Sequence, residues 1–316
     1  MIDTIRIYRE VSFPIEKLEI LRNKFKFSTY KQKYNDEMEV EGCYENMHIK
    51  ISQTRVVITG SLNVFSKGSN VKVASISDLY NSVEMISEFI GIVLMDFIVT
   101  RVDMSINILS DLSIEMIKQT LTVPQYLNLI PFDSGISYKN SSRMLCFYDK
   151  IKQTKSEKVN IPLEFRSREF IRVEYRLMKA NVINSVFKTS RTTLIDLFDK
   201  YELLQNFFKN ILVDLKWSEA KMQNIAQLHD MDFKVFLMHK GLEAIGGIKE
   251  GYALIEIKKL KEGGYRNKYV NYKKLLEELN TNITSNEVTQ QILMFKQLIK
   301  VAFDYDKICR DTTVFR

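Results

Sequence analysis

Apolar and polar residues alternate along eight segments within the first 180 residues of the chain. Successive side chains of a β-strand point to opposite faces, so this alternation predicts strands with one apolar and one polar face. The predicted strands are residues 4–8, 38–44, 47–52, 55–62, 97–109, 135–138, 143–149 and 169–178. Polar breaks at 53–54 and 139–142 predict hairpins, and the Gly-, Ser- and Asn-rich stretch 60–70 predicts a turn.

Helical spacing of apolar residues appears between these strands and replaces the alternation after residue 188. One helix is predicted from a cap at Ser77 or Asp78 to about Met95, a second over 111–121, and a charged helix or loop over 150–158. Further helices are predicted over residues 194–203, 207–215, 219–228, 233–244, 269–279 and 287–303.

This order of elements predicts an α+β fold in which helices pack on one face of an antiparallel β-sheet. We expect a domain over residues 1–188, followed by an all-helical C-terminal region over residues 189–316, with no long linker between them. The tripeptide Arg-Val-Asp at 101–103 is echoed by Arg-Val-Glu at 172–174, which hints at a sheet built from two related halves.

Three of the predicted strands carry polar faces of unusual chemistry. If these strands belong to one sheet, a tyrosine, a lysine, two carboxylates and several arginines meet on one surface. The residues that share a face within their strands are Arg101, Asp103, Ser105 and Asn107; Tyr148 and Lys150; and Arg172, Glu174 and Arg176. This set of side chains suits phosphodiester chemistry on DNA.

Composition places the chain among folded globular proteins, and its net positive charge favours a polyanionic partner, either nucleic acid or an anionic membrane surface. Of its 316 residues, 45% are hydrophobic and 27% are charged, and the net charge is +7. Three dispersed cysteines without a C-x-x-C motif predict neither a disulfide framework nor a zinc ribbon, and favour a reducing cytosolic compartment. We expect no signal peptide and no membrane association, because the most apolar run, 85–95, is too short to span a bilayer.

Asp103 and Glu174 are candidate ligands for Mg²⁺ or Mn²⁺, because carboxylate oxygens are the ligands that hard cations prefer. The alternative is an ion pair with Arg101 or Arg172, which is the usual role of charges on a strand face. His48, on the strand 47–52, is a weaker candidate for a third ligand; the chain has only three histidines and no His-hydrophobic-His motif.

Four arginines are candidates for clamping DNA phosphates through paired N–H donors, with carboxylate pairing or plain solvation as the alternative. They are Arg101, Arg143, Arg172 and Arg176. Lys150 is placed to favour the phenolate form of Tyr148 and to stabilise charge in a transition state. The chain lacks a G-x-x-x-x-G-K-[ST] phosphate loop, so we do not expect it to hydrolyse ATP or to unwind DNA itself.

Taken in order, four motifs resemble the replication initiators of the filamentous-phage gene II/X family and the related Rep proteins of small rolling-circle plasmids. They span roughly residues 1–180, and the helical region beyond them gives no sharp match. The motifs are Met-Ile-Asp-Thr-Ile at 1–5, Gly-Ser-Leu-Asn-Val-Phe at 60–65, Thr-Arg-Val-Asp at 100–103, and Tyr148-x-Lys150 followed by Arg-Val-Glu at 172–174. The stretch at 60–65 lacks the histidine that some relatives carry there, which leaves the composition of a metal site open.

The resemblance implies that Tyr148 is a nucleophile that attacks a scissile phosphate, forms a 5′-phosphotyrosine link and leaves a 3′-OH primer. The resemblance implies a Rep-type nicking fold and a site-specific DNA endonuclease and strand transferase that starts rolling-circle replication in phage or plasmid DNA. A phenol with a pKa near 10 needs activation for this role. The chemistry would be assisted by Mg²⁺ or Mn²⁺.

The implied partners are origin DNA, both double-stranded and single-stranded, and the helicase, DNA polymerase and single-strand binding protein of a bacterial host, in whose cytoplasm it would act. The helical region would recognise the double-stranded origin, form a homodimer, or both. Two alternatives remain open at this stage. One is a conjugative relaxase with the same chemistry, and the other is a DNA-binding replication regulator without catalysis.

Overall fold

The computed structural model describes residues 2–25, 28–32, 38–156, 169–217 and 285–311. The chain divides into two compact units. The first contains residues 1–118, 123–216 and 295–316, and the second contains 119–122 and 217–294, of which only 119–122, 217 and 285–294 are described. Every residue of the candidate site described below belongs to the first unit.

The described strands form one antiparallel ten-stranded sheet, in the order β2-β3-β4-β5-β1-β6-β10-β9-β8-β7. The strands are β1 (Ile2–Glu10), β2 (Ser28–Gln32), β3 (Met38–Tyr44), β4 (Met47–Ser52), β5 (Arg55–Ser61), β6 (Ile98–Ser110), β7 (Asn128–Phe132), β8 (Gly135–Lys139), β9 (Arg143–Asp149) and β10 (Glu169–Leu177). The prediction of an α+β fold with an antiparallel sheet is confirmed. The β6 strand lies near the middle of the sheet, between β1 and β10.

The alternation in the sequence sets the two faces of this sheet. Directly opposed residues of neighbouring strands share a face, so Val102, Val173 and Phe147 lie on what we call the apolar face. Asp103, Glu174 and Tyr148 lie on the other, the polar face. In the centre of the sheet both faces are buried, and this is why polar side chains there must find partners within the protein.

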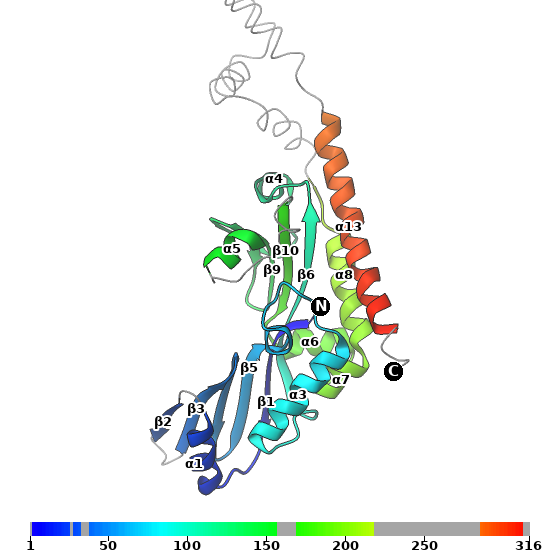
Figure 1. The fold of residues 1–316 in the computed structure, drawn as a ribbon. Helices are drawn as coiled ribbons and strands as arrows, with labels where there is room; N and C mark the ends of the chain where they lie inside the picture. The colour runs from blue at the N-terminus through cyan, green and yellow to red at the C-terminus, as the bar shows by residue number, and fades with distance from the viewer. Residues whose placement is uncertain (1, 26–27, 33–37, 157–168, 218–284, 312–316) are drawn as a thin grey trace, which may run out of the picture. The chain divides into compact units, whose positions relative to one another are not determined.

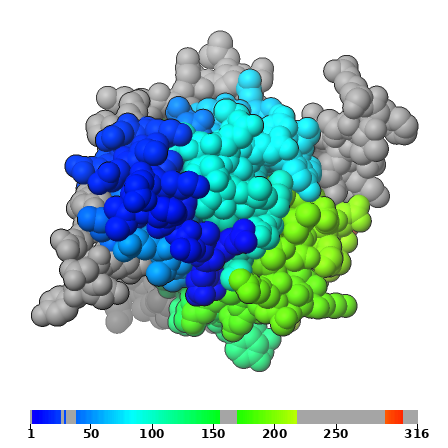
Figure 2. Space-filling view, turned by 90° about the horizontal axis from the view of Figure 1, so that it is seen from below, coloured from blue at the N-terminus to red at the C-terminus, as the bar shows by residue number. Residues whose placement is uncertain are grey.

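Most of the long helices pack on the apolar face. The helices α1 (Ile15–Lys24) and α3 (Ile76–Ile90) pack near β3, where Phe89 stacks on Tyr44 and meets Phe25. The helix α8 (Tyr201–Val213) runs along β6 and β10 (Figure 1), where Phe207 and Phe208 contact Tyr175. Phe303 of α13 (Ser285–Asp311) packs against Phe208. In the view from below, the segments containing α1, α3 and α6–α8 form a continuous surface (Figure 2).

The prediction that helices cover only one face needs correction. The helix α5 (Lys150–Ser156) begins on the polar face, because the Nζ of Lys150 lies 5.9 Å from the ring centroid of Tyr148. The loop after α2 (Leu62–Lys67) also covers the polar face, since the carbonyl of Asn70 accepts a hydrogen bond from Arg172. Polar loops and a short amphipathic helix can cover this face because its side chains offer hydrogen-bond partners.

Several elements differ from those expected. The stretch 60–70 contains α2, which begins after Ser61, whose side chain accepts from the backbone N–H of Val64. The helix α3 is capped by Ser75 in a capping box with Asp78, and it ends where Gly91 adopts a left-handed φ of 74°. The helix α8 continues through 204–206, where a break was expected. The alternation and periodicity did not reveal α1, β2, β7 and α6 (Ala180–Phe187).

The two described helices between residues 188 and 217 belong to the first compact unit. The helix α7 (Leu194–Asp199) and α8 belong to the same compact unit as the sheet, because their apolar sides complete its core. The α4 helix (Ile114–Thr120) lies within the predicted range 111–121. The predicted helices 219–228, 233–244 and 269–279 lie outside the described residues. Within the described part, no helix combines the length and apolarity needed to cross a membrane.

Candidate functional site

The registers of β6, β10 and β9 bring the predicted polar residues together. Arg172 lies opposite Asn107 on one side and Tyr148 on the other, and Arg176 lies opposite Asp103. These side chains therefore meet on the polar face, as expected from the sequence pattern. With Asp3 they form what we call the arginine–carboxylate cluster, which consists of Asp3, Arg101, Asp103, Arg172, Glu174 and Arg176.

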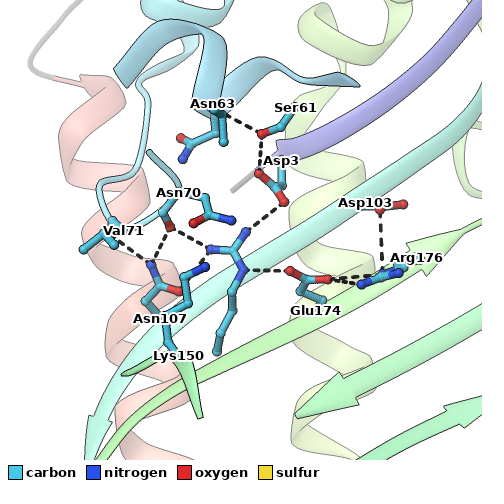
Figure 3. A network of polar contacts seen from close by, with 12 residues as sticks. Asp3, Ser61, Asn63, Asn70, Val71, Asp103, Asn107, Lys150, Glu174 and Arg176 are labelled. Atoms are coloured by element: carbon cyan, nitrogen blue, oxygen red, sulfur yellow. Dashed lines mark hydrogen bonds and ion pairs between the residues drawn. The ribbon is translucent and has the colours of Figure 1, made fainter. Parts of the chain in front are cut away.

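Arg172 is the centre of this cluster and is only 1% exposed. Its Nε donates to Glu174 Oε1 at 2.7 Å, and its Nη1 donates to the carbonyl of Asn70 at 2.9 Å and to Asn107 Oδ1 at 3.1 Å. Its Nη2 lies 2.9 Å from Asp3 Oδ2, an ion pair whose angle is poor for a hydrogen bond. Figure 3 shows Asp3, Asn70, Asn107 and Glu174 gathered in this network. Arg172 is too enclosed to contact DNA in this conformation.

Glu174 joins the cluster to the predicted nucleophile. Its Oε1 accepts a hydrogen bond of 2.6 Å from the hydroxyl of Tyr148, and its Oε2 accepts from Arg176 Nη2 at 2.7 Å. Burial acts to raise the pKa of Glu174, but the charges of Arg172 and Arg176 outweigh it and lower this pKa to about 2. Glu174 is therefore a firmly ionised carboxylate that holds the tyrosine hydroxyl by accepting its proton in a hydrogen bond.

Asp103 joins the cluster through Arg176, whose Nε lies 3.7 Å from Asp103 Oδ2. Arg101 donates hydrogen bonds to both carboxylate oxygens of Asp103, from Nε to Oδ1 at 2.8 Å and from Nη2 to Oδ2 at 2.6 Å. Burial raises the pKa of Asp103 even though Arg101 and Arg176 act to lower it. The side chains of Arg101 and Arg176 are 32% and 29% exposed, so these two arginines form the accessible edge of the cluster.

Tyr148 is closed off in this state. Tyr148 is only 7% exposed. Burial, together with the negative charge of Glu174, raises the pKa of its phenol. The phenol is therefore fully protonated at neutral pH and poorly accessible. For Tyr148 to react with a substrate, the residues that bury it must move apart. The arginines that keep the pKa of Glu174 low must also change their contacts.

Lys150 lies near Tyr148, but not in the way the strand pattern predicted. The β9 strand ends at Asp149, and Lys150 is the first residue of α5, so its position does not follow from strand alternation. Its Nζ is fully buried, donates to Gln153 Oε1 at 2.8 Å and lies 5.9 Å from the ring centroid of Tyr148. A buried cation beside the phenol ring is still placed to stabilise negative charge there.

Asp3 is a member of the site that the sequence pattern did not single out. Its strand is irregular there, because Ile2 pairs with Met104 and Ile5 pairs with Val102, so that three steps on β1 match two on β6. Such a bulge changes which face a side chain points to. The carboxylate of Asp3 accepts from Ser61 Oγ at 2.7 Å and pairs with Arg172.

Asparagines fix the loop that covers Arg172. The sequence pattern placed Asn107 on the polar face but did not mark Asn63 as a site residue. Asn63 is buried, and its side chain bonds the carbonyl of Lys72 at 2.7 Å and the N–H of Ala74 at 2.6 Å. Asn107 donates to the carbonyls of Asn70 and Val71 (Figure 3). The Gly-Ser-Leu-Asn stretch that looked like a plain turn thus folds a cover over the cluster, and the buried Asn63 is the residue that organises it.

Two predicted site residues lie elsewhere. His48 is on β4 and pairs with Glu41 at 2.8 Å. Three strand steps separate β4 from β6, roughly 14 Å at the usual strand spacing, so His48 does not meet Asp103. Arg143 lies opposite Leu177 and is therefore on the apolar face. There its side chain hydrogen-bonds the side chain of Tyr175.

The carboxylates as arranged do not fit a divalent metal ion. Each oxygen of Asp3, Asp103 and Glu174 already contacts an arginine, a serine or a tyrosine donor. Three carboxylates face three guanidinium groups, so the cluster carries no net negative charge to attract a cation. Among the residues that the structure describes, no group of three His, Cys, Asp or Glu side chains could hold a metal ion. The ion-pair alternative describes these contacts.

A pH prediction follows from Glu174, whose pKa falls from 4.5 to about 2 on folding. Its ionised form therefore stabilises the fold above about pH 4.5, and this contribution is lost as the pH falls through 2. Linkage gives a loss of roughly 2 kcal/mol by pH 3, partly offset by Asp103, whose raised pKa has the opposite effect. Urea unfolding from pH 6 to pH 3 should show a smaller loss of stability in Glu174→Gln than in the wild type.

The control for this experiment is Glu16→Gln, which changes an exposed carboxylate in the first turn of α1. Its stability should follow the pH dependence of the wild type. If Glu174→Gln lost stability with acid as steeply as the wild type does, the buried carboxylate would not be held ionised by the two arginines.

Comparison with known proteins adds no assignment. No family model matches the chain, and no curated protein matches it. The likeness to gene II/X-type initiators therefore depends on the four motifs alone.

Proposed function

We propose that the protein nicks and rejoins one strand of DNA at a replication origin through a 5′-phosphotyrosine link at Tyr148. The observation that carries this proposal is the 2.6 Å hydrogen bond from the Tyr148 hydroxyl to Glu174, next to Arg172, Arg176 and Lys150. A tyrosine, a proton acceptor and several cations within one buried cluster match the needs of phosphoryl transfer. The ordered motifs at 60–65, 100–103, 148–150 and 172–174 support the same reaction class.

In the proposed step, the Oη of Tyr148 attacks the phosphorus of a DNA phosphodiester. The bond from the phosphorus to the 3′-oxygen breaks, and the phosphate stays on the tyrosine through its 5′ side. Glu174 accepts the phenolic proton, and the departing 3′-oxygen takes one up to become a hydroxyl. Reversal of the same step rejoins the strand, so no oxidant, nucleotide or other reactant is consumed.

Substrate binding would also provide the activation that the closed state lacks. Arg176 is partly exposed and holds Glu174 Oε2, and its charge helps to keep the pKa of Glu174 low. A DNA phosphate that draws Arg176 away would raise the pKa of Glu174 and make it a better proton acceptor for Tyr148. In this scheme the phenol is activated only when a phosphate is present, which limits reaction with water or with the wrong bond.

The cations have separate roles in this scheme. Arg101 and Arg176 at the accessible edge bind phosphate oxygens, and Lys150 stabilises the charge that develops beside the phenol ring. Arg172 is a positioning residue, because it orients Glu174 and is enclosed. On this basis the protein would act on origin DNA in a bacterial cell and depend on the host helicase and polymerase.

A second candidate function is favoured by the closure of Tyr148. Its burial and raised pKa suit a protein that keeps the fold for DNA binding and performs no chemistry. Such a regulator would bind the same DNA and leave every strand intact. The two functions differ in a single observable, a covalent bond between protein and DNA.

The experiment is incubation of the protein with a supercoiled plasmid carrying the DNA that encodes and flanks its own gene. Denaturing electrophoresis then shows whether one strand is nicked and whether a protein–DNA adduct forms. The reaction is run with Mg²⁺, with Mn²⁺ and with a chelator. An adduct supports the strand transferase, whereas binding without a nick under all three conditions, and on single-stranded DNA, supports the regulator.

A further inference from the structure

The polar face of the sheet is hollow on the other side of β6 from Tyr148. A cavity of about 670 Å³ lies over β3, β4, β5 and β1. The charged residues that line it are Arg6, Glu10, Glu39, Lys50 and Arg55. The helices α1 and α3 lie against the opposite face of these strands, as Phe25, Phe89 and Tyr44 show.

Lys50 and Glu39 neutralise each other. The remaining charged residues of the lining are two arginines and one glutamate, which leave a net positive charge. Lys50 pairs with the buried Glu39 at 2.7 Å, and the exposed Glu10 lies directly opposite Arg55 across the β1–β5 pair, which leaves Arg6 as the surplus charge. Arg6 is exposed and has no ion pair or hydrogen bond from its side chain within the described part of the chain. Arg55 lies over the ring of Tyr8, 4.2 Å from its centroid.

Arg6 also lies directly opposite Arg101 across the β1–β6 pair. Like charges at directly opposed positions destabilise a sheet. Asp103 offsets the charge of Arg101, whereas no carboxylate among the described residues pairs with Arg6. The charge of Arg176 acts on Arg101 as well, so these two lie close together. Arg6, Arg101 and Arg176 therefore form a row over three neighbouring strands that leads from the cavity to the edge of the arginine–carboxylate cluster.

The ligand that relieves such a row is a chain of phosphates. From β4 to β9, which carries Tyr148, there are five strand steps, roughly 24 Å at the usual strand spacing, which is the length of a few nucleotides. The stacked Arg55–Tyr8 pair offers a flat cationic platform of the kind on which unpaired bases stack. In a duplex the bases already stack on each other, so this platform favours a single strand.

We propose that a single strand of nucleic acid crosses the sheet from the cavity to Tyr148, with its phosphates on Arg6 and Arg101 and a base on the Arg55–Tyr8 pair. This inference rests on the proposed function, because it takes the strand to be the one that Tyr148 cleaves. It names the bound form of the substrate and gives Arg6, Tyr8 and Arg55 a role in holding it.

The test is fluorescence anisotropy of a labelled 15-nucleotide single strand from the gene's flanking DNA, titrated with wild type, Arg6→Ala and Arg9→Ala. Arg9 is the matched control, because it is on the same strand, faces the other side and pairs with Asp96. We expect Arg6→Ala to weaken binding on the order of tenfold and to lower the slope against log salt by about 0.7, the value for one phosphate contact on a single strand. Arg9→Ala should bind like the wild type.

Equal affinities of Arg6→Ala and Arg9→Ala would overturn the inference, as would a duplex of the same sequence that bound as tightly as the single strand. Both replaced side chains are partly or fully exposed, and thermal melts of the variants check that they are folded. Binding needs no cleavage, so Arg6-dependent binding without any adduct in the nicking assay would refute the proposed function alone.

Discussion

Replacement of Tyr148 by phenylalanine should abolish the covalent protein–DNA adduct and lower the rate of nicking by on the order of a thousandfold or more. The variant keeps the ring, its packing and its place opposite Arg172, and it removes only the oxygen that attacks phosphorus. DNA binding should remain within a few-fold of wild type, because Arg101 and Arg176 are untouched. The measurement is denaturing electrophoresis of the nicking reaction beside an anisotropy titration.

The matched control is Tyr138→Phe. Tyr138 is another buried tyrosine of the same sheet, and burial raises the pKa of its phenol to about 12. It lies opposite Leu145, however, and so points to the apolar face, away from Glu174. An adduct that survived in Tyr148→Phe and vanished in Tyr138→Phe would show that the wrong tyrosine has been assigned.

The effect of Tyr148→Phe on stability should be small in comparison. One hydrogen bond to an ionised carboxylate is lost, which is on the order of 1–3 kcal/mol, and Glu174 Oε1 keeps its bond from Arg172. A folded and inactive variant is therefore the expected outcome. This separates loss of the nucleophile from loss of the fold.

The sequence was sufficient to predict that these polar side chains share one face of a sheet, because strand alternation is a local signal. Arg101 and Asp103, like Arg172 and Glu174, are two residues apart on strands that the pattern identifies, so their shared face follows directly. The structure adds the register, which decides that Tyr148 lies opposite Arg172 and that Arg143 lies on the other face. Register depends on contacts between distant segments, and a single strand does not encode it.

The residues that were missed depend on departures from regular structure. Asp3 reaches the cluster through a bulge in β1, and Lys150 reaches Tyr148 from the first turn of a helix. Asn63 and Asn70 act through a loop whose backbone groups are the partners. None of these contacts follows from the periodic pattern of apolar and polar residues in the sequence. The buried Arg172 shows the same limit, because an arginine on a polar strand face looks equally suited to DNA and to a salt bridge.

Replacement of Arg172 by methionine should destabilise the fold by about 3–5 kcal/mol, the largest stability change that we expect from any single substitution in the site. Methionine fills much of the volume of the arginine stem but leaves Asp3 and Glu174 without their shared cation in a buried setting. The carbonyl of Asn70 loses its donor as well, so the cover over the cluster should loosen. Urea unfolding followed by circular dichroism measures the change.

The matched control is Arg9→Met, which breaks an exposed pair with Asp96 and should change stability by less than about 1 kcal/mol. A double-mutant cycle with Glu174→Gln tests the cause. If the penalty comes from an unpaired buried carboxylate, Arg172→Met should do less harm once Glu174 is neutral, and the two changes should not add. Additive changes, or a loss no greater than that of Arg9→Met, would mean that Arg172 does not hold the cluster together. In that case Arg172 would not be the residue that positions Glu174 against Tyr148.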